Sequence, residues 1–228
     1  MTESALSALF TWTVVMPVKV LAQAKSRLAV LAGPRRPSLA LAFASDTVSA
    51  VLTCPDVARV LVVTSDTVAE RQLSELGASV VPDSPDAGLN EALSYGALVA
   101  ARRWQGSGIA ALTADLPALR PAELSRALRA ACAAAAAGNA SSFVPDAAGV
   151  GTTMYAVAPW GAFSPQFGGP SRRQHALTGA FELSLDGIAG LRRDVDTPED
   201  LRAAVALGTG FRTTALAGEL LDGASSGG

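Results

Sequence analysis

The segment VVMPVKVLAQAKSRL, residues 14–28, decides the fold. It opens with an apolar run that ends at Pro17, which is typical of a buried strand in an α/β protein. Such a strand commonly leads into a phosphate-binding turn that is rich in glycine, so that backbone N–H groups can approach the phosphates. This turn has no glycine and contains Lys19, Lys25 and Arg27 instead. The sequence therefore indicates a first strand followed by a cationic loop in place of a glycine cradle.

Strands and helices alternate along the first half of the chain. Runs rich in valine and other apolar residues predict strands at 14–18, 57–66, 78–83 and 108–115. Helical spacing predicts helices between them, at 38–54 with Ser38 as its N-cap, at 66–77, at 89–104 and at 121–138. Short loops between alternating strands and helices imply right-handed parallel crossovers. We therefore expect an α/β fold with a doubly wound sheet.

The pattern changes in the second half. Two strands around a glycine-containing turn are predicted within 141–159, and further strands at FELSL (181–185) and GLRRDVD (190–196). These make the sheet mixed, though mostly parallel. A last helix is predicted at 197–208, and the tail from about Gly210 is expected to fray. We expect one domain over 1–228, with a core at about 12–208 and a tail at each end.

Composition excludes several classes of protein. The net charge is −2 and the pI is about 5.4, so no basic field points to nucleic acid or to a membrane surface. Cys54 and Cys132 do not have a metal-ligand spacing and are read as buried thiols, and a single histidine, His175, argues against a histidine metal site. The apolar run at 4–18 has no basic residue before it and is too short for a membrane span. We expect a cytoplasmic protein.

Carboxylates follow two of the predicted strands. Asp115 ends GIAALTAD, and Asp194 and Asp196 end GLRRDVD. Ligands in open α/β sheets bind outside the carboxyl ends of the strands, and Mg²⁺ typically takes one or two protein carboxylates together with substrate phosphates. Asp115 and Asp194 are therefore predicted to bind Mg²⁺, although Asp115 can also simply accept hydrogen bonds from its own turn. For Asp196 with Thr197, capping of the helix that follows is the stronger interpretation.

Two glycine-containing loops are candidates for binding an anion. GVGTT (149–153) and FGGPS (167–171) combine glycines with hydroxyls, and two arginines follow the second loop. This combination suits a phosphate or a carboxylate, but glycine and proline also mark ordinary tight turns. Asn90 is a candidate for binding the base or ribose of a nucleotide, or only its own turn. His175 is interpreted as a helix-surface residue rather than a pocket residue.

Several of these motifs together resemble a known family. PVKVLAQAKSRL, TADLPAL, GLNEAL, GTT, FGGPS and RRDVDTPEDL, in this order, resemble the guanylyltransferases of coenzyme F-420 biosynthesis. The resemblance covers about residues 13–207 and is closest to the bacterial phosphoenolpyruvate guanylyltransferases, whose archaeal relatives act on 2-phospho-L-lactate. It implies the nucleotidyltransferase fold of the glycosyltransferase-A-like superfamily. It also implies transfer of GMP from GTP to phosphoenolpyruvate, which releases diphosphate and gives enolpyruvyl-diphospho-guanosine for the next enzyme of the pathway.

The resemblance also assigns roles to residues of this chain. The Mg²⁺-binding aspartates fall on Asp115 and Asp194, and the loop containing Lys25 lies over the triphosphate, where a lysine and a metal stabilise charge at the α-phosphorus. The acceptor's own phosphate is then the nucleophile. The sequence reads GGPS where relatives often carry GPDS. The remaining assignments are Thr152, Gly168 and Ser171 for phosphoenolpyruvate, and Lys19, Lys25, Arg27 and Asn90 for the nucleotide.

Two other functions compete with this interpretation. A sugar-phosphate or molybdopterin nucleotidyltransferase shares the fold but usually keeps a glycine-rich first loop, which residues 18–28 lack. A nucleotide-binding module without catalytic activity needs no pair of metal-binding aspartates at strand ends. From the spacing of Lys19, Lys25 and Arg27 alone, a solvated basic loop is the simpler interpretation of residues 18–28, and an α/β domain of another role is the remaining alternative.

Overall fold

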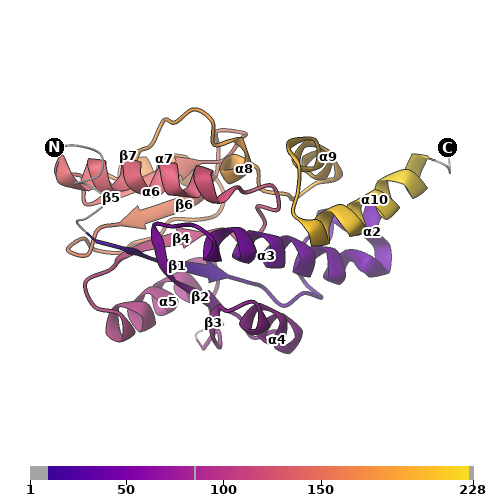
Figure 1. Cartoon of the computed structure of the whole chain (residues 1–228), viewed down its shortest axis with the longest axis horizontal. Helices are drawn as coiled ribbons and strands as arrows, with labels where there is room; N and C mark the ends of the chain where they lie inside the picture. Colours follow the sequence, from indigo (N-terminus) through magenta and orange to yellow (C-terminus); the bar gives the residue numbers. More distant parts are fainter. Residues whose placement is uncertain (1–9, 85, 226–228) are drawn as a thin grey trace.

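The computed structural model describes residues 10–84 and 86–225, and its strands form one mixed sheet (Figure 1). The strand order is β3-β2-β1-β4-β6-β5-β7, and within the described residues β6 alone runs antiparallel to its neighbours. This confirms the predicted mixed, mostly parallel sheet. The strands are β1 (Trp12–Pro17), β2 (Val57–Val63), β3 (Ser79–Val81), β4 (Gly108–Leu112), β5 (Ser141–Pro145), β6 (Thr152–Val157) and β7 (Phe181–Glu182).

Helices cover both faces of the sheet. Figure 1 shows the sheet between α6 on one side and α5 on the other. The α-helices are α2 (Ala29–Ala32), α3 (Arg36–Leu52), α4 (Thr67–Glu75), α5 (Leu89–Arg103), α6 (Pro121–Ala136), α7 (Ser171–Leu177), α8 (Ala189–Arg192), α9 (Pro198–Leu207) and α10 (Phe211–Ser225). Two short 3₁₀ helices, η1 (Ser26–Leu28) and η2 (Gly33–Arg35), flank α2.

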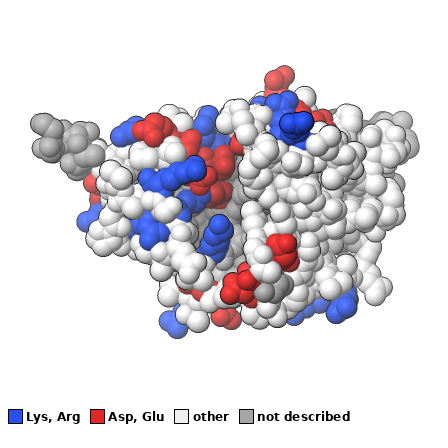
Figure 2. All heavy atoms as spheres, turned by 180° about the vertical axis from the view of Figure 1, so that it is seen from behind, with Lys and Arg blue, Asp and Glu red and all other residues white. Residues whose placement is uncertain are grey.

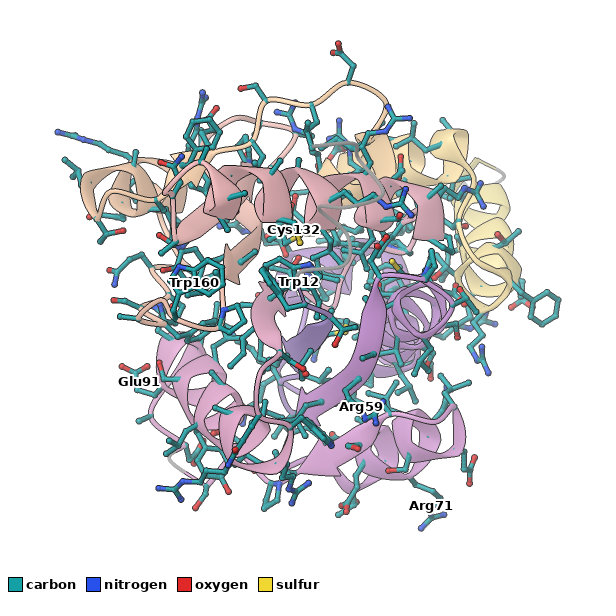
Figure 3. The ribbon with its side chains drawn as sticks, turned by 60° about the vertical axis from the view of Figure 1, so that its left-hand side comes forward. Trp12, Arg59, Arg71, Glu91, Cys132 and Trp160 are labelled. Atoms are coloured by element: carbon teal, nitrogen blue, oxygen red, sulfur yellow. The ribbon has the colours of Figure 1, made fainter. Side chains whose placement is uncertain are left out.

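The two-residue period of β1 produces a core on each face. Val14 and Met16 pack with α3 and α6, whereas Val15 points to the other face and packs with α5. Gly96 allows α5 to approach closely, because a Cβ there would lie 2.6 Å from a methyl carbon of Val15. Figure 3 shows Trp12 and Cys132 lying between the sheet and α6. Both layers therefore hold β1 rigidly, and its carboxyl end has a fixed position.

The first long helix begins earlier than predicted. Its N-cap is not Ser38, because α3 starts at Arg36 with Pro37 in its first turn. The chain is already helical through η1, α2 and η2 before it reaches this point. Ser38 therefore lies inside a continuing helix, and there is no helix terminus at that position for its hydroxyl to cap.

The predicted strand at GLRRDVD is wrong. Its first residues form α8, where the Gly190 N–H donates to Glu123 Oε1 at 3.0 Å and a Cβ would lie 2.2 Å from the carbonyl oxygen of Ala118. The following residues form no strand, although the Val195 N–H donates to the Asp115 carbonyl at 3.1 Å. This segment therefore packs against α6 as a short helix instead of pairing with a strand of the sheet. FELSL forms a strand only at Phe181–Glu182.

The chain after Gly210 forms α10 rather than a frayed tail. The carboxylate of Asp46 on α3 accepts hydrogen bonds from the Thr213 N–H at 2.8 Å and the Arg212 N–H at 3.3 Å, which caps the start of α10. Ala217 is buried against α3, and Figure 1 shows α10 beside that helix. Most of the predicted N-terminal tail lies outside the described residues. None of the helices described is long and apolar enough to cross a membrane.

Candidate active site

A cleft of about 390 Å³ opens at the edge of the sheet where β1 and β4 end. The first residue of β6, Thr152, lies at the same edge because β6 runs antiparallel to β4. On the face shown in Figure 2, acidic and basic side chains adjoin each other in one patch, while large areas beside it carry neither. The cleft lies where parallel strands of α/β proteins usually present their ligand-binding residues.

The loop after β1 is held in place without a glycine. Lys25 itself adopts the left-handed conformation, with φ of 55°. The Leu21 N–H donates to Asp66 Oδ2 at 2.9 Å, and the Arg36 guanidinium donates to the carbonyls of Ala24 and, at 2.6 Å, Ala22. A non-glycine residue in this region costs free energy and persists only where its surroundings enforce it. Contacts from α3 and from the start of α4 therefore fix where the Lys25 side chain begins.

Two carboxylates hold the ammonium of Lys25. Its Nζ donates to Asp115 Oδ2 and, at 2.7 Å, to Asp196 Oδ1. Burial alone would lower the pKa of Lys25, but the two carboxylates outweigh it, and the pKa lies above its usual value. The lysine is therefore a permanent cation whose side chain is only 12% exposed.

Acidic groups crowd the same side of the cleft. Burial raises the pKa of Asp194 to about 7, and the carboxylates of Asp115, Asp146 and Asp196 add to the rise. Asp146 follows β5 and accepts hydrogen bonds from the Val150 N–H at 2.9 Å and the Gly151 N–H at 2.8 Å. The site gathers more negative charge than Lys25 alone compensates.

This side of the cleft suits a divalent cation. Asp115 Oδ1 is buried without a hydrogen-bond partner, and Asp194 lies among carboxylates that repel its charge. Within the described residues no group of three or more histidine, cysteine or acidic side chains is already arranged around a metal position. Mg²⁺ does not need such a cage, because it commonly binds through one or two carboxylates and completes its shell with water and substrate phosphates.

The two glycine-containing loops also contribute to the lining of the cleft, and this part of it is here called the second wall. Thr152 and Ser171 line it and are almost fully buried, and Gly168 lies between them with φ of +100°. Asn90 fastens the second loop to α5, because its amide donates to the Phe167 carbonyl at 3.0 Å and accepts from the Phe167 N–H at 2.8 Å. The second wall adjoins the acidic groups, because Asp146 accepts hydrogen bonds from the backbone of the first of these loops.

Most residues predicted for the site from the sequence meet in this one cleft. Arg27 and Asn90 are not among the residues that line it: Arg27 is exposed, and Asn90 braces the Phe167 backbone. The charges of Arg27 and Lys19 help Lys25 to hold the pKa of Asp196 below its usual value, against the effect of burial. The predicted residues that line the cleft are Lys19, Lys25, Asp115, Thr152, Gly168, Ser171 and Asp194.

The structure divides the roles of Asp196 and Thr197. Thr197 caps α9, because its hydroxyl accepts from the Asp200 N–H at 3.2 Å while the Asp200 carboxylate accepts the Thr197 N–H at 3.0 Å. The Asp196 carboxylate points instead to Lys25. Capping is therefore the role of Thr197 alone, and the interpretation of Asp196 as a cap is wrong.

The surface interpretation of His175 is also wrong. The side chain has no exposed area and lies behind Thr152 and Ser171, where its Nδ1 is 3.1 Å from Thr152 Oγ1. Burial lowers the pKa of the imidazole to about 4. His175 follows Ser171 by four residues, so both lie on the same face of α7, and that spacing was the signal for its burial.

Sequence reasoning missed Asp146 and Asp66. Asp146 directly follows an apolar strand, as Asp115 nearly does, and the same argument from strand ends would have selected it. Asp66 caps α4 by accepting from two N–H groups while it also holds Leu21. Nothing local to the sequence links Asp66 to the basic loop, since the contact depends on β1 and β2 pairing side by side.

The fold is one that nucleotidyltransferases have. A nucleotidyl transferase of known structure from Methanothermobacter thermautotrophicus has the same fold, with a TM-score of 0.58 at 22% identity over 86% of this chain and 97% of that one. The family model described as "Guanylyl transferase CofC like" matches residues 12–216, and this chain belongs to that family.

Two relatives similar in sequence carry the same name, phosphoenolpyruvate guanylyltransferase. The protein of Thermomonospora curvata is 59% identical over 218 residues, which cover 96% of this chain and 93% of the relative. The protein of Streptomyces coelicolor is 56% identical over 211 residues, or 92% of this chain and 97% of the relative. The match therefore extends over nearly the whole of both chains.

Proposed function

We propose that this guanylyltransferase moves GMP from GTP to phosphoenolpyruvate, as the names of its relatives say of them. The observation that carries the proposal is the meeting of two unlike sets of groups in one cleft. Lys25 and the aspartates are one set of lining groups, Thr152, Gly168 and Ser171 of the second wall are the other, and both sets line the same cleft. Such a cleft suits two phosphate-bearing molecules that must meet. The product would be enolpyruvyl-diphospho-guanosine, a step in coenzyme F-420 biosynthesis.

The loop after β1 is the proposed site of the triphosphate. Lys19, Lys25 and Arg27 supply positive charge there, and the position of Lys25 is fixed by the backbone. During transfer, negative charge grows on the non-bridging oxygens of the α-phosphate, and a preorganised ammonium in a water-poor site stabilises that charge. Lys25 would then exchange one of its carboxylate partners for a phosphate oxygen.

The second wall, with Thr152, Gly168 and Ser171, is the proposed site of the acceptor and is called the acceptor wall below. Thr152 and Ser171 offer hydroxyls, and Gly168 offers backbone without a side chain, which suits an anion carrying a phosphate and a carboxylate. An oxygen of the acceptor phosphate forms the new bond to the α-phosphorus. The bond from that phosphorus to the β-phosphate oxygen breaks, and diphosphate leaves with the electron pair. The protein supplies position and charge rather than a nucleophile.

Asp115 and Asp194 are the proposed ligands of Mg²⁺. The unpartnered Oδ1 of Asp115 and the raised pKa of Asp194 both favour a cation at this place. When bound, the ion would neutralise charge on the triphosphate oxygens. Lys25 keeps Asp115 oriented through its hydrogen bond, and Asp196 keeps Lys25 in place from the other side.

A substrate panel tests the proposal. The protein is incubated with Mg²⁺, one of GTP, ATP, CTP or UTP, and either phosphoenolpyruvate or 2-phospho-L-lactate, and the products are identified by mass spectrometry. We expect enolpyruvyl-diphospho-guanosine and diphosphate from GTP with phosphoenolpyruvate. Transfer from CTP or ATP in preference to GTP, or a clear preference for 2-phospho-L-lactate, would overturn the proposal. Asp186→Asn, an exposed change outside the cleft, should leave the result unchanged.

A further inference from the structure

His175 lies in a closed aromatic cage behind the acceptor wall. Its ring stacks on Tyr155 at a centroid distance of 4.7 Å and on Phe143 at 5.5 Å, and Phe167 meets it edge-on at 5.3 Å. These rings come from β6, β5 and the loop before α7. His175 does not itself line the cleft, so anything it does for the reaction must act through residues that do.

Hydrogen bonds determine which ring nitrogen carries the proton. The Gln166 backbone N–H lies 3.0 Å from Nε2 and can only donate, so Nε2 is the acceptor. The burial that lowers the pKa to about 4 keeps the ring neutral at physiological pH, and its one proton then lies on Nδ1. Nδ1 is 3.0 Å from the Ser171 carbonyl oxygen, which can only accept, and this agrees with the same tautomer.

The same proton decides the direction of the Thr152 hydroxyl. Oγ1 of Thr152 is 3.1 Å from Nδ1, and because a protonated Nδ1 cannot accept a hydrogen bond, the hydroxyl can only share that N–H with the Ser171 carbonyl oxygen and cannot donate to the ring. Its own proton is then free, and Thr152 lines the cleft. One ring thereby ties together Thr152, Ser171 and the backbone before Phe167, which are the three points that shape the acceptor wall.

We propose that His175 is a positioning residue for the acceptor, and that it turns the Thr152 hydroxyl so that its proton points to an anionic oxygen of the bound acid. The inference rests on the proposed function, because it takes the acceptor to be the ligand of this wall. It goes further in assigning a role to a side chain that never touches the substrate.

Three variants at one position test the inference. The Asn side chain places its amide N–H near the position of Nδ1 and can still donate to Thr152. The Gln side chain places its oxygen near the position of Nε2 and keeps only the hydrogen bond from the Gln166 N–H. The Phe side chain keeps the ring stacking but neither hydrogen bond. We expect His175→Phe and His175→Gln to raise KM for phosphoenolpyruvate by roughly tenfold or more, as loss of a hydrogen bond to a charged group does. His175→Asn should raise it by less, and KM for GTP should stay within about twofold throughout.

A purely structural role would give a different pattern. Equal increases in both KM values, equal effects of Asn and Gln, or an unchanged KM for phosphoenolpyruvate in folded variants would each overturn the inference. Trp12→Phe is the matched control, because Trp12 is a buried aromatic residue at the far end of β1. It should lower stability without changing either KM.

A second measurement needs no variant. His175 is the single histidine of the chain, so selective ¹⁵N labelling gives one imidazole signal in NMR. We expect the neutral form with the proton on Nδ1, and a shift of that signal when phosphoenolpyruvate is added. The opposite tautomer or an imidazolium ion at pH 7 would contradict the inference.

If the wild-type protein makes no product from GTP and phosphoenolpyruvate, the proposed function fails. If the wild type is active but the His175 variants keep its KM for phosphoenolpyruvate, only the role of His175 fails.

Discussion

At the scale of single residues, Lys25 combines an unusual backbone conformation with two carboxylate partners. The left-handed φ and the contacts to Asp115 and Asp196 place one largely buried cation at a defined point of the cleft. A group held in this way gains its effect from charge that appears during the reaction rather than from binding the substrate. The value of Lys25 should therefore appear in kcat more than in affinity.

Removal of the Lys25 charge tests this view. Lys25→Met keeps much of the side-chain length and should lower kcat by roughly 100-fold or more, with a smaller change in the affinity for GTP. Lys25→Arg should restore activity only in part, because a planar guanidinium does not replace a compact ammonium at a crowded phosphate. Lys19→Met, a change in the same loop without an ion pair to Asp115, should cost less. Normal kcat with a raised KM for GTP would instead assign Lys25 to nucleotide capture alone.

The two proposed metal ligands should be equally indispensable. Asp115→Asn and Asp194→Asn each remove a charge from a site with few protein ligands, and each should abolish turnover while the protein stays folded. The check is the initial rate across a Mg²⁺ titration together with circular dichroism. Near wild-type activity of either variant at saturating Mg²⁺ would remove that residue from the site.

At the scale of the element, the start of α9 separates a stability role from a catalytic one. Thr197→Ala removes the cap and should lower the free energy of unfolding by about 1 kcal/mol. Asp196→Asn should cost far less in stability, yet it removes one partner of Lys25 and should lower kcat by roughly tenfold, or about 1.4 kcal/mol. Denaturant unfolding and steady-state kinetics on both variants decide the matter. A larger loss of stability in Asp196→Asn and a larger loss of kcat in Thr197→Ala would instead show that Asp196 caps α9.

Elements with a strong local pattern were predictable, and elements made by tertiary contacts were not. The valine-rich runs of β1 and β2 and the helical spacing of Leu41, Ala44 and Val48 in α3 carried their own signal, so the edge of the sheet and the place of Asp115 followed. Four residues of α8 form a helix because Gly190 packs onto α6, and no window of sequence contains that contact. The pairing of Lys25 with Asp196, 171 residues apart, belongs to the same kind. The motifs therefore predicted which residues meet but not which partner each would take.

At the scale of the whole molecule, one reversed strand brings the two proposed substrate sites to the same edge of the sheet. Parallel strands β1 and β4 end beside the cationic loop and Asp115, and the antiparallel β6 begins at the same edge with Thr152. A parallel β6 would place that threonine at the opposite edge of the sheet, about 17–20 Å away for a strand of this length. The mixed sheet is thus the reason that Lys25, Asp115 and Thr152 line the same cleft.

The buried histidine should leave a mark on the stability of the whole fold. With a pKa of about 4 in the folded chain and 6.5 as the reference, His175 binds a proton more readily when the chain is unfolded. Its contribution is complete above pH 6.5 and is lost as the pH falls toward 4, by about 3 kcal/mol at pH 4. Tyr155, the titratable group stacked on the ring, has a raised pKa and stays neutral over this range.

The measurement compares urea unfolding of the wild type and His175→Gln between pH 4 and 8. The wild type should lose more stability than the variant below pH 6.5, and the difference between them should be constant above pH 7. Parallel curves over the whole range would show that the imidazole is not buried in its neutral form.

The central claim is that the cleft joins two phosphates directly and contributes charge and position, with no protein nucleophile. The stereochemical course at the α-phosphorus tests it most directly. GTP carrying sulfur at one non-bridging α-oxygen, as a single diastereomer, is allowed to react with phosphoenolpyruvate, and the configuration of the product is determined by ³¹P NMR. A single in-line displacement predicts inversion at that phosphorus. Retention would mean two displacements through a guanylylated side chain and would contradict the account.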